Sequence, residues 1–98
     1  MPYKVVYSTA ARADLLEIER YIAGRGSPRN GASFVEAIVE RCEDLALAPY
    51  QGVRRDDILL GIRTTGFRRR ATIAFRVTPG VILIAGIFYG GKRVILHP

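Results

Sequence analysis

The sequence predicts an α+β fold with an N-terminal strand, a helical hairpin and then a three-stranded antiparallel meander that completes a four-stranded sheet. A change in hydropathy pattern predicts this order. Apolar residues recur at helical spacing between residues 10 and 48, whereas they alternate with polar residues or run together between residues 58 and 89. A chain of 98 residues has room for one core. We therefore expect residues 1–98 to form a single domain.

The first two elements are a short strand and a helix. Residues 3–7 (YKVVY) are rich in β-branched and aromatic side chains, and Ser8 or Thr9 can cap a helix start. Residues 10–24 form the expected helix, because the apolar residues recur on one face: Ala11, Leu15, Ile18 and Ile22. We expect Gly24 and Gly26 to end this helix.

A second helix is expected to begin at Ser27-Pro28, where a capping side chain precedes a proline in the first turn. Pro49 is expected to end it. Between them runs a broad apolar stripe: Phe34, Val35, Ile38, Val39, Cys42, Leu45 and Ala46. Because the connection between the two helices is short and glycine-rich, we expect a helical hairpin.

The meander is expected after an irregular stretch, residues 50–57. The four charged residues that end this stretch (RRDD) should form ion pairs with one another. Residues 58–65 are the first expected strand, and residues 71–77 alternate apolar and polar side chains as a second strand does. Residues 78–81 (TPGV) have the composition of a type II turn, so a hairpin follows directly.

The last expected strand, residues 81–89 (VILIAGIFY), is apolar on both faces, which is typical of a central strand. Simple alternation divides its side chains between two faces, with Ile82, Ile84 and Phe88 on one and Val81, Leu83, Ile87 and Tyr89 on the other. A helical hairpin covers only one face of the sheet. We expect a partner protein or the C-terminal residues 94–96 (VIL) to cover the other face.

Charge is unevenly distributed along the chain. Residues 1–50 carry a net charge of −1, whereas residues 51–98 carry nine Lys or Arg against two Asp, a net charge of +7. The basic second half indicates an anionic partner, and charge alone does not choose between nucleic acid, an acidic protein and a membrane surface. The sequence has no secretory signal or membrane span, and its only cysteine, Cys42, is expected in the core. We therefore expect a cytoplasmic protein with no membrane partner.

Several segments, in this order along the chain, resemble the RelE/ParE family of toxins, and specifically its ParE branch. They are YKVVYSTAARADLLEIERYIA, FVEAIVERCEDLALAP with the following QGVRRDD, GIRTTGFRRRATIAFRV and ILIAGIFYGG, which together span nearly the whole chain. The resemblance implies a sheet packed against a helical hairpin. It also implies a growth-arresting toxin, of the kind used in plasmid stabilisation, that forms a hetero-oligomer with a cognate antitoxin through an acidic C-terminal segment of the antitoxin.

The two branches of that family imply different activities. The ParE branch implies inhibition of DNA gyrase by stabilising its cleaved DNA complex, which needs a contact surface and no catalysis by the toxin. The RelE branch implies a ribosome-dependent mRNA endonuclease, which needs proton transfer and neutralisation of phosphate charge. The candidates for those two roles are Tyr89, His97, Arg63 and Arg76. The chain ends in FYGGKRVILHP, with glycines where the RelE branch places basic residues, so we favour the gyrase hypothesis.

Under the gyrase hypothesis, the expected target-binding residues are cations of the second half: Arg63, Arg68, Arg69, Arg70, Arg76, Lys92 and Arg93. The expected antitoxin-binding residues are apolar: Leu15, Ile18, Ile22, Phe75, Ile84 and Phe88. We expect no metal and no other cofactor, because the chain has a single histidine and lacks HExxH, CxxC and a glycine-rich phosphate loop. The alternatives are the ribonuclease and a non-toxic homologue that keeps antitoxin binding.

Overall fold

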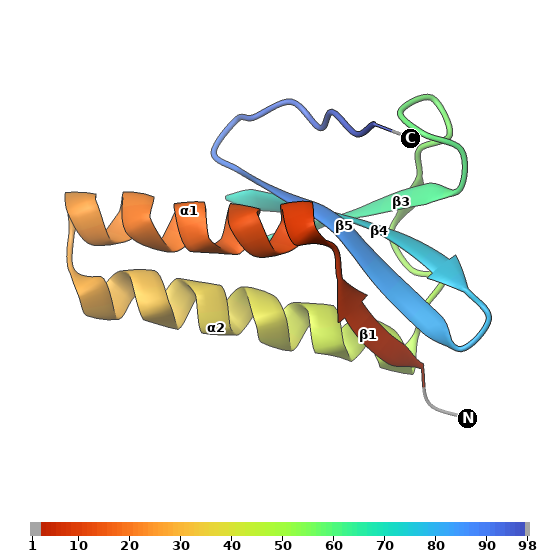
Figure 1. The fold of residues 1–98 in the computed structure, drawn as a ribbon, viewed down its shortest axis with the longest axis horizontal. Coiled ribbons are helices and arrows are strands. Elements are labelled where there is room, and N and C mark those ends of the chain that lie inside the picture. The colour runs from red at the N-terminus through yellow and green to blue at the C-terminus, as the bar shows by residue number, and fades with distance from the viewer. Residues whose placement is uncertain (1–2, 98) are drawn as a thin grey trace.

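The computed structural model describes residues 3–97 and confirms the α+β class, with two helices packed on a mixed sheet (Figure 1). In chain order the elements are β1 (Lys4–Tyr7), α1 (Thr9–Arg25), α2 (Pro28–Asp44), the short 3₁₀ helix η1 (Leu45–Leu47), β2 (Val53–Arg54), β3 (Ile62–Phe67), β4 (Ala71–Thr78) and β5 (Val81–Tyr89). The sheet order is β1-β5-β4-β3-β2, in which β1 is parallel to β5 and the other neighbours are antiparallel. β5 is therefore an interior strand, as its apolar sequence predicts.

Two details of the predicted sheet are wrong. The sheet has five strands, because residues 53–54 pair with β3 as the edge strand β2 in a stretch expected to be irregular. β3 begins at Ile62 rather than at residue 58, since the preceding residues form turns. Within these turns the Gly61 N–H donates a hydrogen bond to the Asp56 carboxylate (3.0 Å). A two-residue exposed strand has no hydropathy pattern by which a sequence could reveal it.

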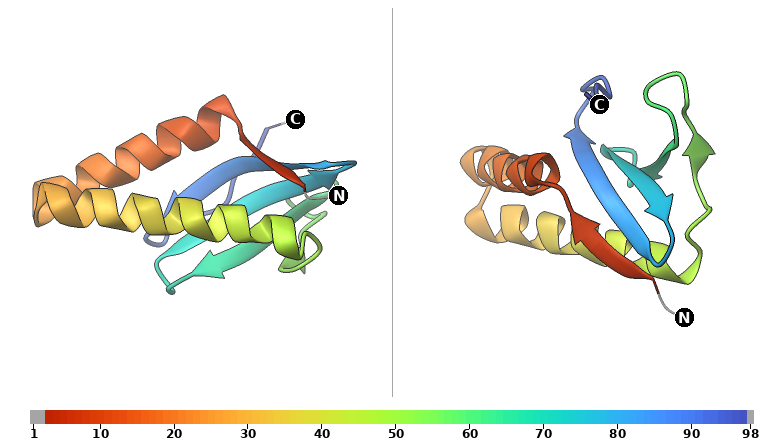
Figure 2. Two further views of the ribbon diagram at one scale, coloured as in Figure 1. Left: turned by 90° about the horizontal axis from the view of Figure 1, so that it is seen from below. Right: turned by 45° about the vertical axis from the view of Figure 1, so that its right-hand side comes forward.

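The helical hairpin begins where its capping residues predict. The hydroxyls of Ser8 and Ser27 each accept a hydrogen bond from a backbone N–H of the following first turn, at 3.0 and 3.1 Å. The helices approach closely at the buried Gly31, where a Cβ would lie 2.6 Å from the Glu19 carbonyl oxygen. Figure 2 shows both helices on one side of the sheet. One face of the sheet is thus covered by the hairpin.

The core lies between the hairpin and this sheet face. Its fully buried side chains come from both layers: Ile73, Phe75, Ile82 and Ile84 from the sheet, and Ile38, Cys42 and Leu45 from α2 and η1. Burial of such apolar area stabilises a fold by about 25 cal/mol per Å². Cys42 is a buried core residue, as expected, and burial raises the pKa of its thiol to about 11. The thiol therefore stays protonated and unreactive at neutral pH.

A bulge in β5 corrects the predicted faces of that strand. The β4–β5 register shifts by one residue, which leaves Ala85 without a partner on β4. Beyond the bulge, Ile87 and Tyr89 share the hairpin face with Ile84, and Phe88 turns to the opposite face. Simple alternation predicts Phe88 on the same face as Ile84, with Ile87 and Tyr89 on the opposite face. It fails here because it does not account for an inserted residue.

The start of α1 supplies hydrogen-bond partners to the bulge. The Ser8 hydroxyl donates to the Ala85 carbonyl oxygen (3.0 Å), and the Ser8 N–H donates to the Ile84 carbonyl oxygen (3.0 Å). The Asp14 carboxylate accepts a hydrogen bond from the Ile87 N–H (2.9 Å). Because an unpaired buried backbone group is costly, these bonds make the irregular point of β5 stable.

The second sheet face is covered in part by the C-terminal segment, which is one of the two predicted alternatives. Residues 92–97 have no regular secondary structure and run back beside the sheet (Figure 1). Leu96 packs over Gly86, where an added Cβ would lie 3.4 Å from the Leu96 methyl group. A hollow of about 420 Å³ remains next to this segment, with Ile62 and Leu83 among its mainly apolar lining.

We predict that Asp14→Ala lowers the free energy of unfolding by about 1–3 kcal/mol, because the Ile87 N–H loses its acceptor. Urea unfolding followed by circular dichroism measures the change. Asp44→Ala is the matched control, since Asp44 is exposed and its side chain makes no capping hydrogen bond. The control should change stability by less than about 0.5 kcal/mol. Equal effects of the two substitutions would contradict the role assigned to Asp14.

Candidate functional site

The β3–β4 turn has a backbone conformation that is rare for arginine. Arg68 and Arg69 have φ values of 51° and 56°, and the Arg70 N–H donates to the Phe67 carbonyl oxygen (2.9 Å). Two successive central residues at positive φ are the signature of a type I′ turn, which asparagine and glycine adopt more readily. The left-handed conformation costs about 1–2 kcal/mol per non-glycine residue. Arginines therefore occupy this turn at the expense of local strain.

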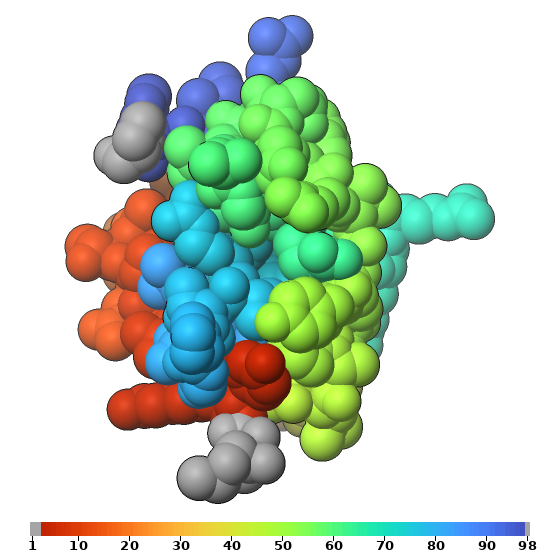
Figure 3. Space-filling view, turned by 90° about the vertical axis from the view of Figure 1, so that its right-hand side faces the viewer, coloured from red at the N-terminus to blue at the C-terminus, as the bar shows by residue number. Residues whose placement is uncertain are grey.

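The side chains of this turn are directed to solvent. Arg68, Arg69 and Arg70, which we name the turn arginines, are exposed, and their side chains make no ion pair or hydrogen bond within residues 3–97. The Arg68 guanidinium lies 4.9 Å from the centroid of the Phe67 ring. In Figure 3 a side chain from this part of the chain, coloured turquoise, projects beyond the body of the molecule. The turn thus presents three adjacent positive charges.

Two hollows flank the turn arginines. One, of about 270 Å³, lies beside Arg69 and Arg70 and extends to Lys92. The other, of about 260 Å³, lies between Arg68 and the first turns of α2, with Asn30 and Ser33 in its lining. Sequence reasoning missed Asn30 and Ser33, because no motif marks them. Their spacing of three residues in a predicted helix is the only signal that they share a face.

Arg63 and Arg76, two further arginines of the expected target surface, are half-buried and hold the loop before β3. Arg63 donates hydrogen bonds to the carbonyl oxygens of residues 50 and 51 (2.7 and 3.1 Å). Arg76 donates to the Leu60 carbonyl oxygen (2.8 Å). Because their guanidinium groups already bind the protein's own backbone, these two residues have a structural role.

The remaining charges of the loop before β3 are largely neutralised within the loop, as expected. Arg54 pairs with Asp56 (3.0 Å) and Arg55 with Asp57 (2.9 Å). The hydrogen bond from the Gly61 N–H, followed by that from Arg54, lowers the pKa of the Asp56 carboxyl below its usual value. This loop therefore adds little net positive charge to the surface.

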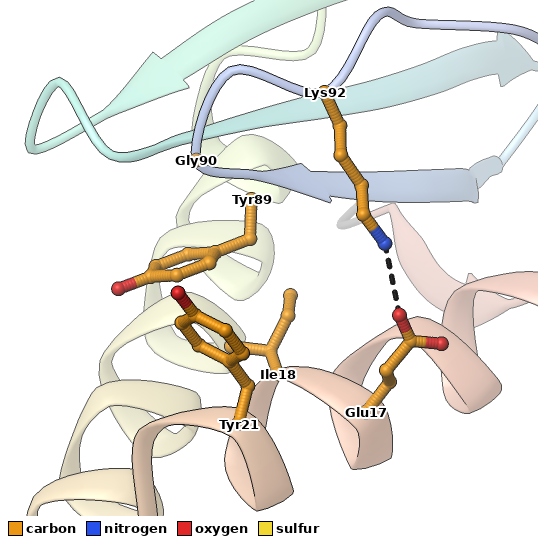
Figure 4. A pocket seen from close by; sticks show the side chains of 6 residues that line it. All are labelled: Glu17, Ile18, Tyr21, Tyr89, Gly90 and Lys92. Carbon is orange, nitrogen blue, oxygen red and sulfur yellow. Dashed lines mark hydrogen bonds and ion pairs between the residues drawn. The ribbon is translucent and has the colours of Figure 1, made fainter. Parts of the chain in front are cut away.

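The two cations after β5 differ in their surroundings. Lys92 pairs with Glu17 of α1 (2.8 Å), and this contact lowers the pKa of the Glu17 carboxyl and raises that of the Lys92 ammonium (Figure 4). Both side chains are exposed, so solvent screens the pair and it contributes little to stability. Arg93 is exposed and makes no ion pair within the described residues. The Lys92–Glu17 pair tethers the start of the C-terminal segment to α1.

Tyr89 packs in an aromatic cluster at the end of β5. Its ring makes edge-on contacts with Tyr21 of α1 (centroids 5.8 Å apart) and Phe34 of α2 (5.4 Å). Figure 4 shows the Tyr21 and Tyr89 rings together at one side of a hollow of about 260 Å³, with the Lys92–Glu17 pair at its other side. Contacts with both helices indicate a packing role for the Tyr89 ring.

The four candidates for ribonuclease chemistry do not converge on one site. Tyr89 lies on the hairpin face of the sheet, whereas Arg76 and His97 both line the hollow on the second face. Arg63 lies on β3, and its guanidinium is directed to the loop before that strand. The structure therefore brings only Arg76 and His97 together, and the Arg76 guanidinium is already bound to Leu60.

The six candidates for antitoxin binding also divide between the core and the surface. Ile18, Phe75 and Ile84 are buried between the hairpin and the sheet, so they have no surface to offer a partner while the hairpin is packed. Leu15, Ile22 and Phe88 are half-buried, and Phe88 lies on the sheet face opposite the hairpin. Sequence reasoning missed two exposed apolar residues of α1, Leu16 and Tyr21, each 49% exposed.

Two further properties bear on function. Within residues 3–97, no cluster of three or more His, Cys, Asp or Glu side chains is arranged to bind a metal ion. Over the same residues, neither helix has the length and apolar character that a membrane span requires.

A family model and solved structures show which known proteins the chain is similar to. A family model described as the ParE toxin of the type II toxin–antitoxin system parDE matches residues 5–94. The chain is similar to a solved chain of the chromosomal ParDE toxin–antitoxin system from P. aeruginosa, with 27% identity and a TM-score of 0.79 over 90% of this chain and 96% of that one. It shares its fold with a chain of the toxin–antitoxin complex RelBE2 from Mycobacterium tuberculosis, with 23% identity and a TM-score of 0.63 over 91% and 99%. No curated protein matches the sequence.

We predict that the double substitution Arg68→Asn with Arg69→Gly raises the free energy of unfolding by about 1 kcal/mol, because Asn-Gly relieves the strain at positive φ. Urea unfolding measures the change. Arg12→Asn with Arg20→Gly, at two exposed positions of α1, should instead destabilise the protein by about 1 kcal/mol. If the turn variant were less stable than the parent protein, the Arg68–Phe67 contact would outweigh the strain.

Proposed function

Since the chain belongs to the ParE toxin family of type II toxin–antitoxin systems, we propose that it inhibits DNA gyrase by stabilising the cleaved DNA complex of that enzyme. A cognate antitoxin neutralises it by binding to the folded toxin. Under this proposal the toxin acts through contact, and gyrase carries out all the chemistry on the DNA. The toxin needs no metal and no cofactor for this activity.

The observation that carries the proposal is the exposed, unpaired state of the turn arginines. Arg63 and Arg76 bind backbone carbonyl oxygens, whereas the turn arginines have no such partner in the described chain. Charges of one sign, held on a short turn, favour association with an anionic surface through complementary potential. We therefore narrow the target-binding surface to the turn arginines and Arg93, which also makes no ion pair in the described chain, whereas Lys92 is paired with Glu17.

The antitoxin-binding surface that we propose is apolar and includes α1. Leu16 and Tyr21 expose large apolar side chains on this helix, with the half-buried Leu15 and Ile22 beside them in the sequence. Phe88 and the hollow beside the C-terminal segment offer apolar surface on the second sheet face. A flexible antitoxin segment that folds on binding suits an extended surface of this kind.

A ribosome-dependent ribonuclease is the second candidate function, and one observation favours it. Arg76 and His97 line the same hollow, so a cation and a group able to transfer protons lie close together there. Against this candidate, the other proposed acid–base group, Tyr89, lies on the opposite face of the sheet. We therefore favour the gyrase proposal. The third candidate is a non-toxic homologue that keeps antitoxin binding. Expression of the protein in a bacterial host tests it directly.

We predict that purified toxin increases gyrase-dependent cleavage of plasmid DNA and leaves ribosome-bound mRNA intact. Arg69→Gln with Arg70→Gln should reduce this cleavage on the order of tenfold, which corresponds to about 1.4 kcal/mol of lost target binding. Arg12→Gln with Arg20→Gln, two exposed arginines of α1, removes the same charge elsewhere and should have little effect. Tyr89→Phe with His97→Ala should also retain activity. Cleavage of mRNA at defined codon positions, with gyrase unaffected, would overturn the proposal.

We predict that the protein encoded by the adjacent reading frame rescues growth when it is coexpressed with the toxin. It should bind the toxin with a dissociation constant in the nanomolar range, which corresponds to a binding free energy on the order of −12 kcal/mol. Leu16→Glu should weaken this binding at least about tenfold, because it places a charge in an apolar interface facing an acidic segment. Leu60→Glu, at an exposed leucine of the loop before β3, is the control. Calorimetric titration at low and high salt should give similar affinities. A steep loss of affinity with salt would instead assign antitoxin binding to the basic surface.

A further inference from the structure

The two hollows beside the β3–β4 turn contain hydrogen-bond donors and no carboxylate. Arg69, Arg70 and Lys92 line the first hollow, and Arg68 and Arg70 line the second. No Asp or Glu side chain lines either one, so nothing in the lining neutralises the guanidinium groups. Arg70 lines both hollows and therefore stands between them. A guanidinium has donors only, in a planar fork that fits the oxygens of a phosphate.

The backbone around the first hollow leaves room for a ligand. Gly66 and Gly91 line it, and a Cβ built on either glycine would meet no atom within 4 Å. Packing within the protein therefore does not require glycine at these two positions. Without side chains there, a ligand can reach the backbone between Arg69 and Lys92.

The second hollow has an additional source of positive potential. Asn30 and Ser33 lie in the first two turns of α2, a helix of 17 residues. The positive end of the helix dipole lies at the first of these turns and favours an anion there. With Arg68 and Arg70 opposite, the donors of the turn and of α2 meet at one place. This arrangement favours the binding of an anion, such as a phosphate group, between the turn and α2.

From this geometry we propose that the β3–β4 turn binds the phosphate backbone of duplex DNA, with one phosphate group on each side of Arg70. The proposal rests on the proposed function, because it makes the DNA held by gyrase part of the surface that the toxin contacts. A toxin that binds both the enzyme and the cleaved DNA would hold the two together.

The aromatic residues of the two hollows favour a duplex over a single strand. Phe34 is buried and Phe88 is half-buried, so neither lining offers an exposed ring on which an unpaired base could stack. Proteins that bind single-stranded nucleic acid generally use such stacking platforms. Contacts limited to phosphates are sufficient for sequence-independent binding to a duplex.

Fluorescence anisotropy with a labelled DNA duplex, in the absence of gyrase, tests the proposal. Arg69→Gln with Arg70→Gln should weaken binding on the order of tenfold at low salt and reduce the salt slope of log K by about two. Both substitutions retain Arg68, whose guanidinium packs on Phe67. The control, Arg12→Gln with Arg20→Gln, should change affinity by less than about twofold. Circular dichroism verifies that both variants fold.

Three outcomes would overturn the proposal. Equal weakening by the two variants would show attraction to net charge alone. Stronger binding to single-stranded RNA than to the duplex would favour the ribonuclease candidate. Absence of duplex binding, with loss of gyrase-dependent cleavage in the turn variant, would assign the turn to an acidic protein surface and leave the proposed function intact.

A fourth outcome separates the two proposals. Duplex binding that depends on the turn, without any effect of the toxin on gyrase, would support DNA binding by the turn and refute gyrase as the target.

Discussion

The hydrogen bonds between the β5 bulge and α1 are the constraint on which the position of the β3–β4 turn depends. The Ser8 hydroxyl donates to the carbonyl oxygen of Ala85 itself, and the Asp14 carboxylate accepts from the Ile87 N–H. Beyond Ala85, the pairing of β5 with β4 is shifted by one residue. The Gly90 N–H then reaches the Arg70 carbonyl oxygen (2.8 Å). That bond fixes the β3–β4 turn from the side of β5. A helix cap and a single carboxylate thus position a turn that is distant in the sequence.

Arginine has two separate uses in this chain, and the partner of each guanidinium distinguishes them. Arg41, Arg63 and Arg76 join the loop before β3 to α2 and to the sheet through hydrogen bonds to amide, hydroxyl and carbonyl oxygens. The side chains of the turn arginines make no such bonds in the described chain, and two of them, Arg68 and Arg69, have a strained backbone. Backbone strain of this kind often occurs at functional positions. The net charge of the second half therefore does not show how many of its guanidinium groups are free of partners within the described residues.

The sequence predicted the elements of the fold well because their signals are local. Ser27-Pro28 marks a helix start, and Pro79-Gly80 marks a turn in which Gly80 has the expected positive φ of 73°. The faces of β5 could not be predicted, because one inserted residue reverses the alternation beyond Ala85. For the candidate site, composition identified the turn arginines. It could not separate them from Arg63 and Arg76, because that distinction depends on carbonyl oxygens brought near by tertiary folding.

The parallel pairing of β1 with β5 has a consequence for the timing of folding. Lys4 is aligned with Val81, so the first strand of the chain stays without its neighbour until the last strand has been synthesised. A nascent chain that stops before β5 also lacks Ile82, Ile84 and Ile87 of the core. Contacts of such long sequence separation form late and slowly. A chain interrupted before β5 therefore lacks the strand that joins β1 to β4, and the sheet that carries the β3–β4 turn is complete only when β5 has been synthesised.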